Sequence, residues 1–162
     1  MNKPTGIYVF SIIHAILGIC LLIGFSFGAS QILESVSKTQ TPPGLFIAGW
    51  LIISLFLIIS SVGLFLGKKY GGYIASLFYA VFFWDTLFTL FTLPHDFLGF
   101  AFIQIQNSLK IIFLLLLFSY FFKNTVSQYL LFSSETKYKR MGSILGIALA
   151  IQLLSILFIK TP

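Results

Sequence analysis

Five long runs of apolar residues, separated by short polar segments, dominate the chain. The runs cover about residues 7–29, 45–67, 73–93, 97–122 and 141–159. An α-helix of about 20 residues crosses the hydrocarbon of a bilayer, so each run is long enough to span it. The pattern predicts an all-α integral membrane protein, with residues 1–162 forming a single membrane domain. We expect its five transmembrane helices to pack as a filled bundle.

The polar segments between the runs contain turn residues. Residues 30–44 are polar and end in Pro-Pro-Gly, residues 68–72 read Lys-Lys-Tyr-Gly-Gly, and residues 94–96 read Pro-His-Asp. Proline and glycine favour turns because they restrict or free the backbone. The two shorter segments are typical of tight connections between antiparallel helices.

The fourth run differs from the others because its first half is polar. It contains Gln104, Gln106, Asn107 and Lys110, and a continuous Ile/Phe/Leu block follows. Two interpretations remain open. The run is either one tilted helix, or a re-entrant or interfacial piece followed by the true span.

Lysine and arginine counts predict the orientation. Alternate connections hold seven of these residues against two in the opposite set. The seven are Lys3, Lys68, Lys69, Lys123, Lys137, Lys139 and Arg140, and the two are Lys38 and Lys160. Cytoplasmic loops carry the excess of Lys and Arg. We therefore expect the N-terminus in the cytoplasm and the C-terminus outside it, in the cytoplasmic membrane of a bacterium.

Composition agrees with the pattern. Hydrophobic residues make up 58% of the chain and charged residues 9%, against about 25% charged in ordinary soluble domains. The net charge of +6 does not indicate nucleic-acid binding, because the basic residues lie at the ends of apolar runs. The predicted contacts to lipid headgroups are Lys68, Lys69, Lys137, Lys139 and Arg140.

Asp85 is the deepest acidic residue. Helix rise places it about 20 Å into the third span, where an ionised carboxylate is unfavourable by about 2.5–3.5 kcal/mol. Thr89 follows one turn later, and Lys110 of the fourth span lies at a similar depth and is the expected partner of Asp85. Two interpretations stay open for Asp85: an ion- or proton-coupled site, or a neutralised carboxylate that holds helices together.

The polar residues of the fourth run cover about half of a helix circumference at 100° per residue. Lipid would disfavour so broad an arc, so we expect this helix at the centre of the bundle or beside a wet vestibule. Gln104, Asn107 and Gln152 would then form one polar layer with Asp85 and Lys110. Such a layer either joins helices through hydrogen bonds or lines a substrate site.

His14, in the first span, is a candidate metal or quinone ligand. No second His or Cys stands at ligand spacing in the same run, and His95-Asp96 in a turn is an isolated pair. The chain also lacks phosphate-binding, metalloprotease and serine-nucleophile motifs. We therefore predict no metal site, no cofactor and no catalytic residues.

Small residues spaced four apart predict close helix contacts, since glycine lets backbones approach. The predicted packing residues are Gly24, Gly28, Gly63, Gly67, Gly142 and Gly146. Between the fourth and fifth runs, Val126, Tyr129 and Leu130 stand at helical spacing. They favour a short amphipathic helix on the inner leaflet, with a solvated loop as the alternative.

Three functions are compatible with these features. We expect a non-enzymatic subunit or accessory component of a larger membrane complex, in contact with lipid and with other membrane subunits or further copies of itself. The alternative is a small oligomeric transporter or channel that uses Asp85 as its coupling carboxylate. The third is an intramembrane enzyme acting on lipid or quinone near His14.

Overall fold

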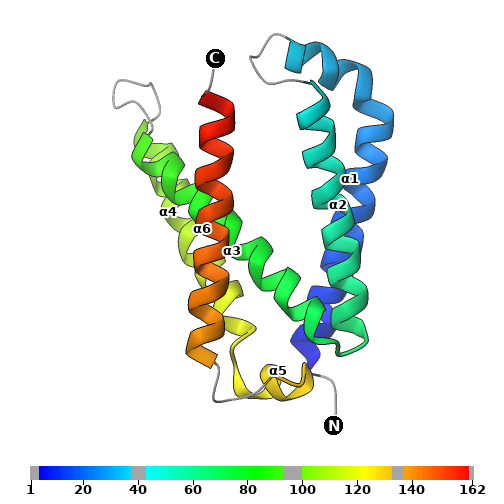
Figure 1. Cartoon of the computed structure of the whole chain (residues 1–162), viewed down its shortest axis with the longest axis vertical. Coiled ribbons are helices and arrows are strands. Elements are labelled where there is room, and N and C mark those ends of the chain that lie inside the picture. The colour runs from blue at the N-terminus through cyan, green and yellow to red at the C-terminus, as the bar shows by residue number, and fades with distance from the viewer. Residues whose placement is uncertain (1–3, 38–42, 93–99, 133–136, 161–162) are drawn as a thin grey trace.

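The computed structural model describes residues 4–37, 43–92, 100–132 and 137–160, and these ranges form six helices (Figure 1). The helices are α1 (Thr5–Ser37), α2 (Pro43–Phe65), α3 (Lys69–Thr92), α4 (Phe100–Tyr120), α5 (Asn124–Tyr129) and α6 (Lys137–Lys160). All except the short α5 are long and apolar enough to cross a membrane. The prediction of an all-α, multi-pass membrane protein with five spans is confirmed.

The helices extend beyond the apolar runs. α1 continues through polar residues to Ser37, and α3 begins at Lys69 rather than near residue 73. Neither extension contains a proline, so nothing in it breaks the helix. α2 begins at Pro43, which suits a first helical position because its missing N–H has no partner there. The predicted turn at residues 94–96 lies outside the described residues, as does the start of the fourth run at 97–99.

α1 and α2 form an antiparallel hairpin closed by polar contacts. The hydroxyls of Ser11 and Ser61 each donate to the other residue's carbonyl, at 2.9 and 2.7 Å. Nearer the other end, the indole of Trp50 donates to the carbonyl of Leu21 at 2.8 Å. These bonds satisfy polar groups that have no water to bind in a membrane.

The α2–α3 turn brings two backbones together. Gly67 has a φ of +66°, and the amide of Lys68 donates to the carbonyl of Gly63 at 2.8 Å. This is a Schellman helix end, which favours glycine in the left-handed region. A Cβ on Gly63 would lie 2.6 Å from the Cα of Gly71, so only glycine fits this contact.

α3 runs obliquely and joins the α1–α2 hairpin to a second group made by α4 and α6 (Figure 1). Its start packs against α2, and further along the indole of Trp84 donates to the carbonyl of Leu145 in α6 at 3.1 Å. The two groups meet at the end that carries α5, here called the α5 end, and separate toward the opposite end (Figure 1). The prediction of a filled bundle is therefore wrong, because the tilt of α3 keeps α2 and α6 apart.

The core lies at the α5 end. Buried apolar residues there come from every helix, among them Ile7, Leu64, Phe118, Phe121, Val126, Leu130 and Ile144. The predicted short helix between the fourth and fifth spans is confirmed as α5. Val126 of α5 and Leu130, which follows its last residue, are buried against the protein, so the prediction that this apolar face lies on the leaflet is wrong.

Candidate functional site

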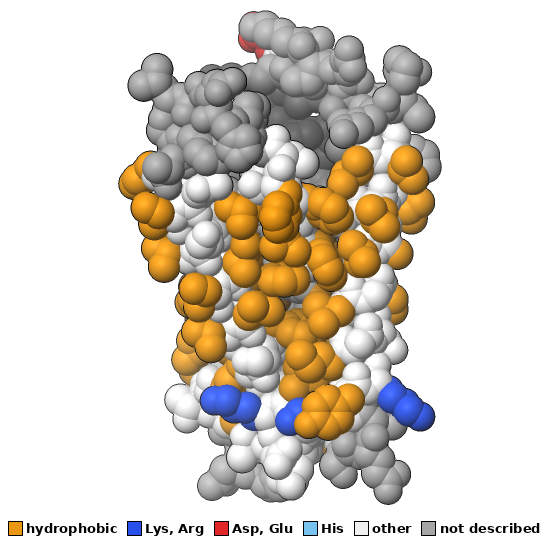
Figure 2. Space-filling model, turned by 90° about the vertical axis from the view of Figure 1, so that its left-hand side faces the viewer, with side chains coloured by type: hydrophobic (Ala, Val, Ile, Leu, Met, Phe, Trp, Pro, Cys, Tyr) orange, Lys and Arg blue, Asp and Glu red, His pale blue; other side chains and the backbone are white. Residues whose placement is uncertain are grey.

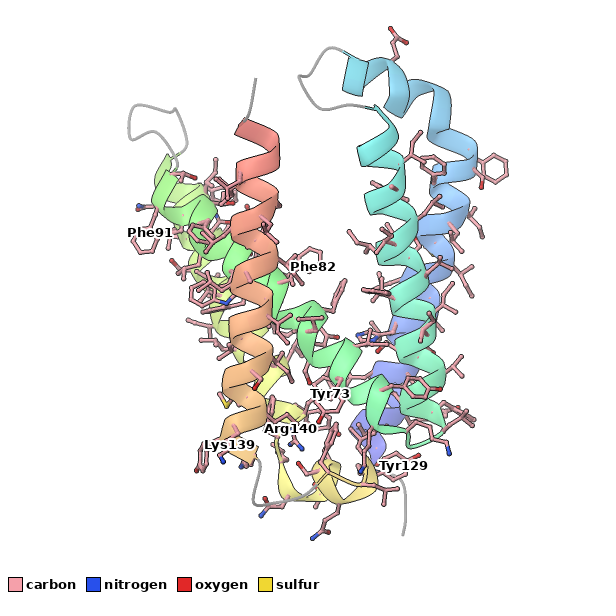
Figure 3. All side chains as sticks on the ribbon, viewed as in Figure 1. Tyr73, Phe82, Phe91, Tyr129, Lys139 and Arg140 are labelled. Atoms are coloured by element: carbon pink, nitrogen blue, oxygen red, sulfur yellow. The ribbon has the colours of Figure 1, made fainter. Side chains whose placement is uncertain are left out.

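A cavity of about 380 Å³ lies where the two helix groups separate. Its walls come from α2, α3 and α6 and are mostly apolar. They are formed by Ile52, Ile53, Phe56, Ile74, Leu77, Phe78, Val81, Phe82, Asp85, Ile151 and Gln152. Figure 3 shows Phe82 in the gap between α6 and the hairpin. We call this cavity the intramembrane groove.

Asp85 and Gln152 form the polar part of the groove wall. The Gln152 amide donates from Nε2 to Oδ1 of Asp85 at 2.9 Å, which joins α3 to α6. Gln152 is buried, whereas the Asp85 side chain is exposed. The hydroxyl of Thr89 donates to the backbone carbonyl of Asp85 and so contributes nothing to the carboxylate. One carboxylate therefore faces the groove with a single neutral donor from the described residues.

Lys110 does not bind Asp85 in this chain. The two residues make no ion pair, and Lys110 is exposed on α4. α4 packs on α3 through the face that includes the buried Asn107 and Phe118. Lys110 is three residues from Asn107, which places it about 60° around the helix from that face. The expected pair fails because equal depth does not place two side chains on facing surfaces.

α4 is peripheral rather than central. Only 11% of its apolar span is buried, against 22–33% for the other four spans. Gln106 is exposed and Gln104 half-buried, and Asn107 alone of the predicted polar layer on this helix is buried. Gln152 lies in the groove with Asp85 instead of joining α4. The part of the polar arc that carries Gln106 and Lys110 is therefore not covered by the described part of the chain.

A second polar cluster is enclosed where α1, α2 and α3 meet. His14 is completely buried, with Nδ1 2.9 Å from the hydroxyl of Ser60 and Nε2 2.7 Å from the hydroxyl of Tyr79. The Ser60 hydroxyl donates to the carbonyl of Gly71 at 3.2 Å. Since its only proton is used there, Ser60 accepts from Nδ1–H, and Tyr79 then donates to Nε2.

This arrangement satisfies every polar atom of a neutral histidine. Both ring nitrogens of His14 are occupied, and rings of Phe10 and Phe78 stand against it at 6.4 and 5.9 Å. The two nitrogens through which a histidine binds a metal or a quinone are therefore both engaged by hydroxyls. Sequence inspection missed Ser60 and Tyr79 as partners. The signal available was the need of any histidine inside a membrane span for two hydrogen-bonding neighbours.

Arg140 is buried at the α5 end instead of binding headgroups. Its guanidinium lies 3.9 Å from the ring centroid of Phe132 and 5.1 Å from that of Phe122, and Nη2 donates to Ser127 at 3.2 Å. Figure 3 shows Arg140 close to Tyr73 at the start of α3. Planar guanidinium stacks well on aromatic faces, which is why this prediction of lipid contact is wrong.

The other four residues predicted to contact headgroups are lysines at the α5 end. Lys68, Lys69 and Lys139 are exposed at the α5 end, and Lys137 is half-buried. Figure 2 shows Lys and Arg side chains along the lower edge of an apolar belt. This is the position that headgroup-binding lysines occupy at a membrane surface.

The predicted glycine contacts divide into two groups. Gly63 packs against Gly71 and Gly67 forms the turn, whereas a Cβ added to Gly24, Gly142 or Gly146 would meet no atom within 4 Å. Sequence inspection also missed Gly18, where a Cβ would lie 3.0 Å from the carbonyl oxygen of Ser54. Four-residue spacing alone did not identify which glycines meet another helix.

In the parts of the chain that the structure describes, no three His, Cys, Asp or Glu side chains gather closely enough to hold a metal ion. His95 and Asp96 lie outside those parts. A scan against protein-family models, a search of curated proteins and a search of solved structures each gave no match.

Proposed function

We propose that the protein is a non-enzymatic component of a larger assembly within the membrane. The observation that carries the proposal is that one copy leaves its costly groups uncovered. Asp85 faces a groove between separated helices, and Lys110 stands on the outer face of the least covered span. Groups of this kind inside a membrane normally face a protein partner or water.

The small amount of chain outside the spans supports the same function. The connection between α2 and α3 is a tight turn, and α5 packs beneath the bundle. These two described connections are too short to form a soluble domain between the spans they join. His14, the one candidate for intramembrane catalysis, is enclosed and hydrogen-bonded at both ring nitrogens.

The experiment is purification in mild detergent, with the mass of the protein part determined by light scattering. An assembly component should elute at a mass above its own 18.2 kDa. Asp85→Asn should reduce that mass or lower the abundance of the complex. A monomer of unchanged mass under all mild conditions would contradict the proposal.

A small oligomeric transporter or channel is the second candidate, and the exposure of Asp85 in the groove is the observation that favours it. In this case Asp85→Asn should leave the mass of the assembly unchanged and abolish the flux of ions or protons into proteoliposomes. The same variant therefore separates the two functions, because only the first predicts a change in assembly.

We also propose that the α5 end faces the cytoplasm of a bacterial cell. The exposed Lys68, Lys69 and Lys139 at this end support that orientation. The test replaces the exposed Cys20 with Ala and introduces Lys123→Cys. A membrane-impermeant maleimide should label this cysteine in inverted vesicles and leave it unlabelled in intact cells. The reverse labelling pattern would overturn the orientation.

A further inference from the structure

We propose that the groove of one copy binds α4 of a second copy, so that Lys110 of one chain pairs with Asp85 of the next. This inference rests on the proposed function and names the partner as the chain itself. Two opposite charges, each without an ionic partner among the described residues of its own chain, lie on two different outer surfaces of the same molecule.

The two charges lie at the same level of the membrane. The guanidinium of Arg140 lies 5.1 Å from the ring centroid of Phe122, two residues after the end of α4, so the start of α6 and the end of α4 lie near one level. Gln152, the partner of Asp85, stands twelve residues after Arg140, or about 18 Å along the helix. Lys110 stands ten residues before Tyr120, where α4 ends, or about 15 Å along that helix. Two copies side by side in one orientation would therefore bring these groups to one depth.

Both charged residues lie well inside membrane-spanning helices. Lys110 stands ten residues from each end of α4, about 15 Å by helix rise, and a lysine stem is too short to cover that distance. Asp85 has only the neutral amide of Gln152 as a partner among the described side chains. An ionised residue at this depth is unfavourable unless it faces a partner or water. Pairing would remove much of that cost for both groups.

The surface around Lys110 has the form of a helix face that could seat in the groove. Gln106, Lys110 and Phe113 follow one another at spacings of four and three residues, and all three are exposed. Residues so spaced form one stripe along a helix. Phe113 would meet apolar groove residues such as Phe56 and Ile151, while Gln106 and Lys110 offer donors to the carboxylate.

The contact joins two different surfaces, so it is heterologous and repeats from copy to copy. Such contacts close into rings or extend as chains. A dimer with two identical surfaces in contact would instead require Asp85 and Lys110 to lie on one shared contact surface. The groove therefore selects head-to-tail association.

The test reverses the two charges, separately and together, because each groove should bind only an opposite charge on α4 of another copy. Asp85→Lys alone and Lys110→Asp alone should each dissociate the wild-type oligomer in mild detergent, because like charges then meet. The double variant should associate again. Mixing the two single variants should also restore association, since each groove then meets an opposite charge on the other chain. Lys123→Asp, beyond the end of α4, is the matched control and should remain oligomeric.

An intramolecular pair cannot be rescued by mixing, so failure of the mixture together with rescue by the double variant would overturn the inference. A second experiment tests the same contact without changing either charge, in case the charge-reversed variants do not fold. In a Cys20→Ala background, chains with Phe113→Cys are mixed with chains carrying Ile151→Cys and oxidised, because these two residues would face each other in the proposed contact. The mixture should form a disulfide-linked dimer. If it forms no more dimer than either variant oxidised by itself, the inference is also overturned. A monomeric chain held in a complex of other proteins would overturn this inference but leave the proposed function intact.

Discussion

The α5 end and the opposite end of the molecule are built on different principles. At the α5 end, backbones touch at Gly63 and Gly71, and His14 is enclosed with all of its polar atoms satisfied. Toward the opposite end the helix groups separate, Asp85 faces a groove, and Lys110 is exposed. The difference indicates that the α5 end holds the fold together, while the open part presents surfaces for another chain.

The largest effect should follow from filling the glycine contact. Gly63→Leu would force side-chain atoms into the backbone of α3, where even a Cβ would lie 2.6 Å from the Cα of Gly71. We expect a loss of about 3 kcal/mol in the free energy of unfolding, at the upper end of overpacking costs. Unfolding in mixed detergent and SDS measures it.

The matched control for this change is Gly146→Leu. Nothing stands within 4 Å of a Cβ at Gly146, so its stability in dilute detergent should change by less than about 0.5 kcal/mol. Equal losses at the two positions would contradict the division between a packed end and an open face.

The enclosed histidine should give the next largest effect. His14→Phe keeps a ring of similar shape but leaves the hydroxyl of Tyr79 without its partner and removes the donor to Ser60. We expect a loss of about 2 kcal/mol, since a buried unsatisfied polar group costs about 1–3 kcal/mol. Unfolding measurements should include Tyr79→Phe and the double variant.

The double variant should lose less than the two single losses added together, because it removes both ends of one hydrogen bond. Tyr138→Phe, at a tyrosine that is 82% exposed, is the control and should have no measurable effect. Strict additivity of His14→Phe and Tyr79→Phe would contradict the hydrogen bond between them.

The spans could be predicted from the sequence, and their arrangement could not. Each span carries enough apolar residues to be recognised alone. A tight connection was predicted at residues 68–72, whereas the turn lies at Gly67 and Lys68, and Gly71 and Gly72 belong to α3. The sequence did not show which face of each helix packs against another helix and which faces lipid. Lipid and the protein interior are equally apolar, so hydrophobic periodicity does not separate the two faces. The glycine spacing at Gly24 predicted a contact that the structure makes at Gly18 instead.

The same limit explains why the partners of the polar residues were not predicted. Depth follows from counting along a helix, so Asp85 and Lys110 were expected at one level. Direction around the helix depends on which neighbour each helix packs against, and α4 turned Lys110 outward. Arg140 differs from prediction in the other direction, because it was expected at the surface and is buried. The rings of Phe122 and Phe132 that bury it lie outside its own helix, so counting along that helix could not identify them.

A smaller effect is expected where a charge is packed at the α5 end. Arg140→Lys keeps the positive charge but loses the planar group that stacks on Phe132 and Phe122. We expect a loss of about 1 kcal/mol in stability, the size of a partly desolvated cation–π contact. Lys139→Arg, at the exposed neighbouring position, is the control in the same unfolding measurement. A larger loss for Lys139→Arg would contradict the burial of Arg140.

The smallest effect on stability should come from the open part of the molecule. Asp85→Asn preserves an oxygen that can accept the hydrogen bond from Gln152, and the side chain remains exposed in the groove. The free energy of unfolding of the isolated chain should therefore change by less than about 0.5 kcal/mol. If residues of the groove serve association rather than folding, the same variant should still weaken the oligomer, measured by its mass across a dilution series in mild detergent. A large loss of stability with unchanged association would reverse the roles assigned to the two ends.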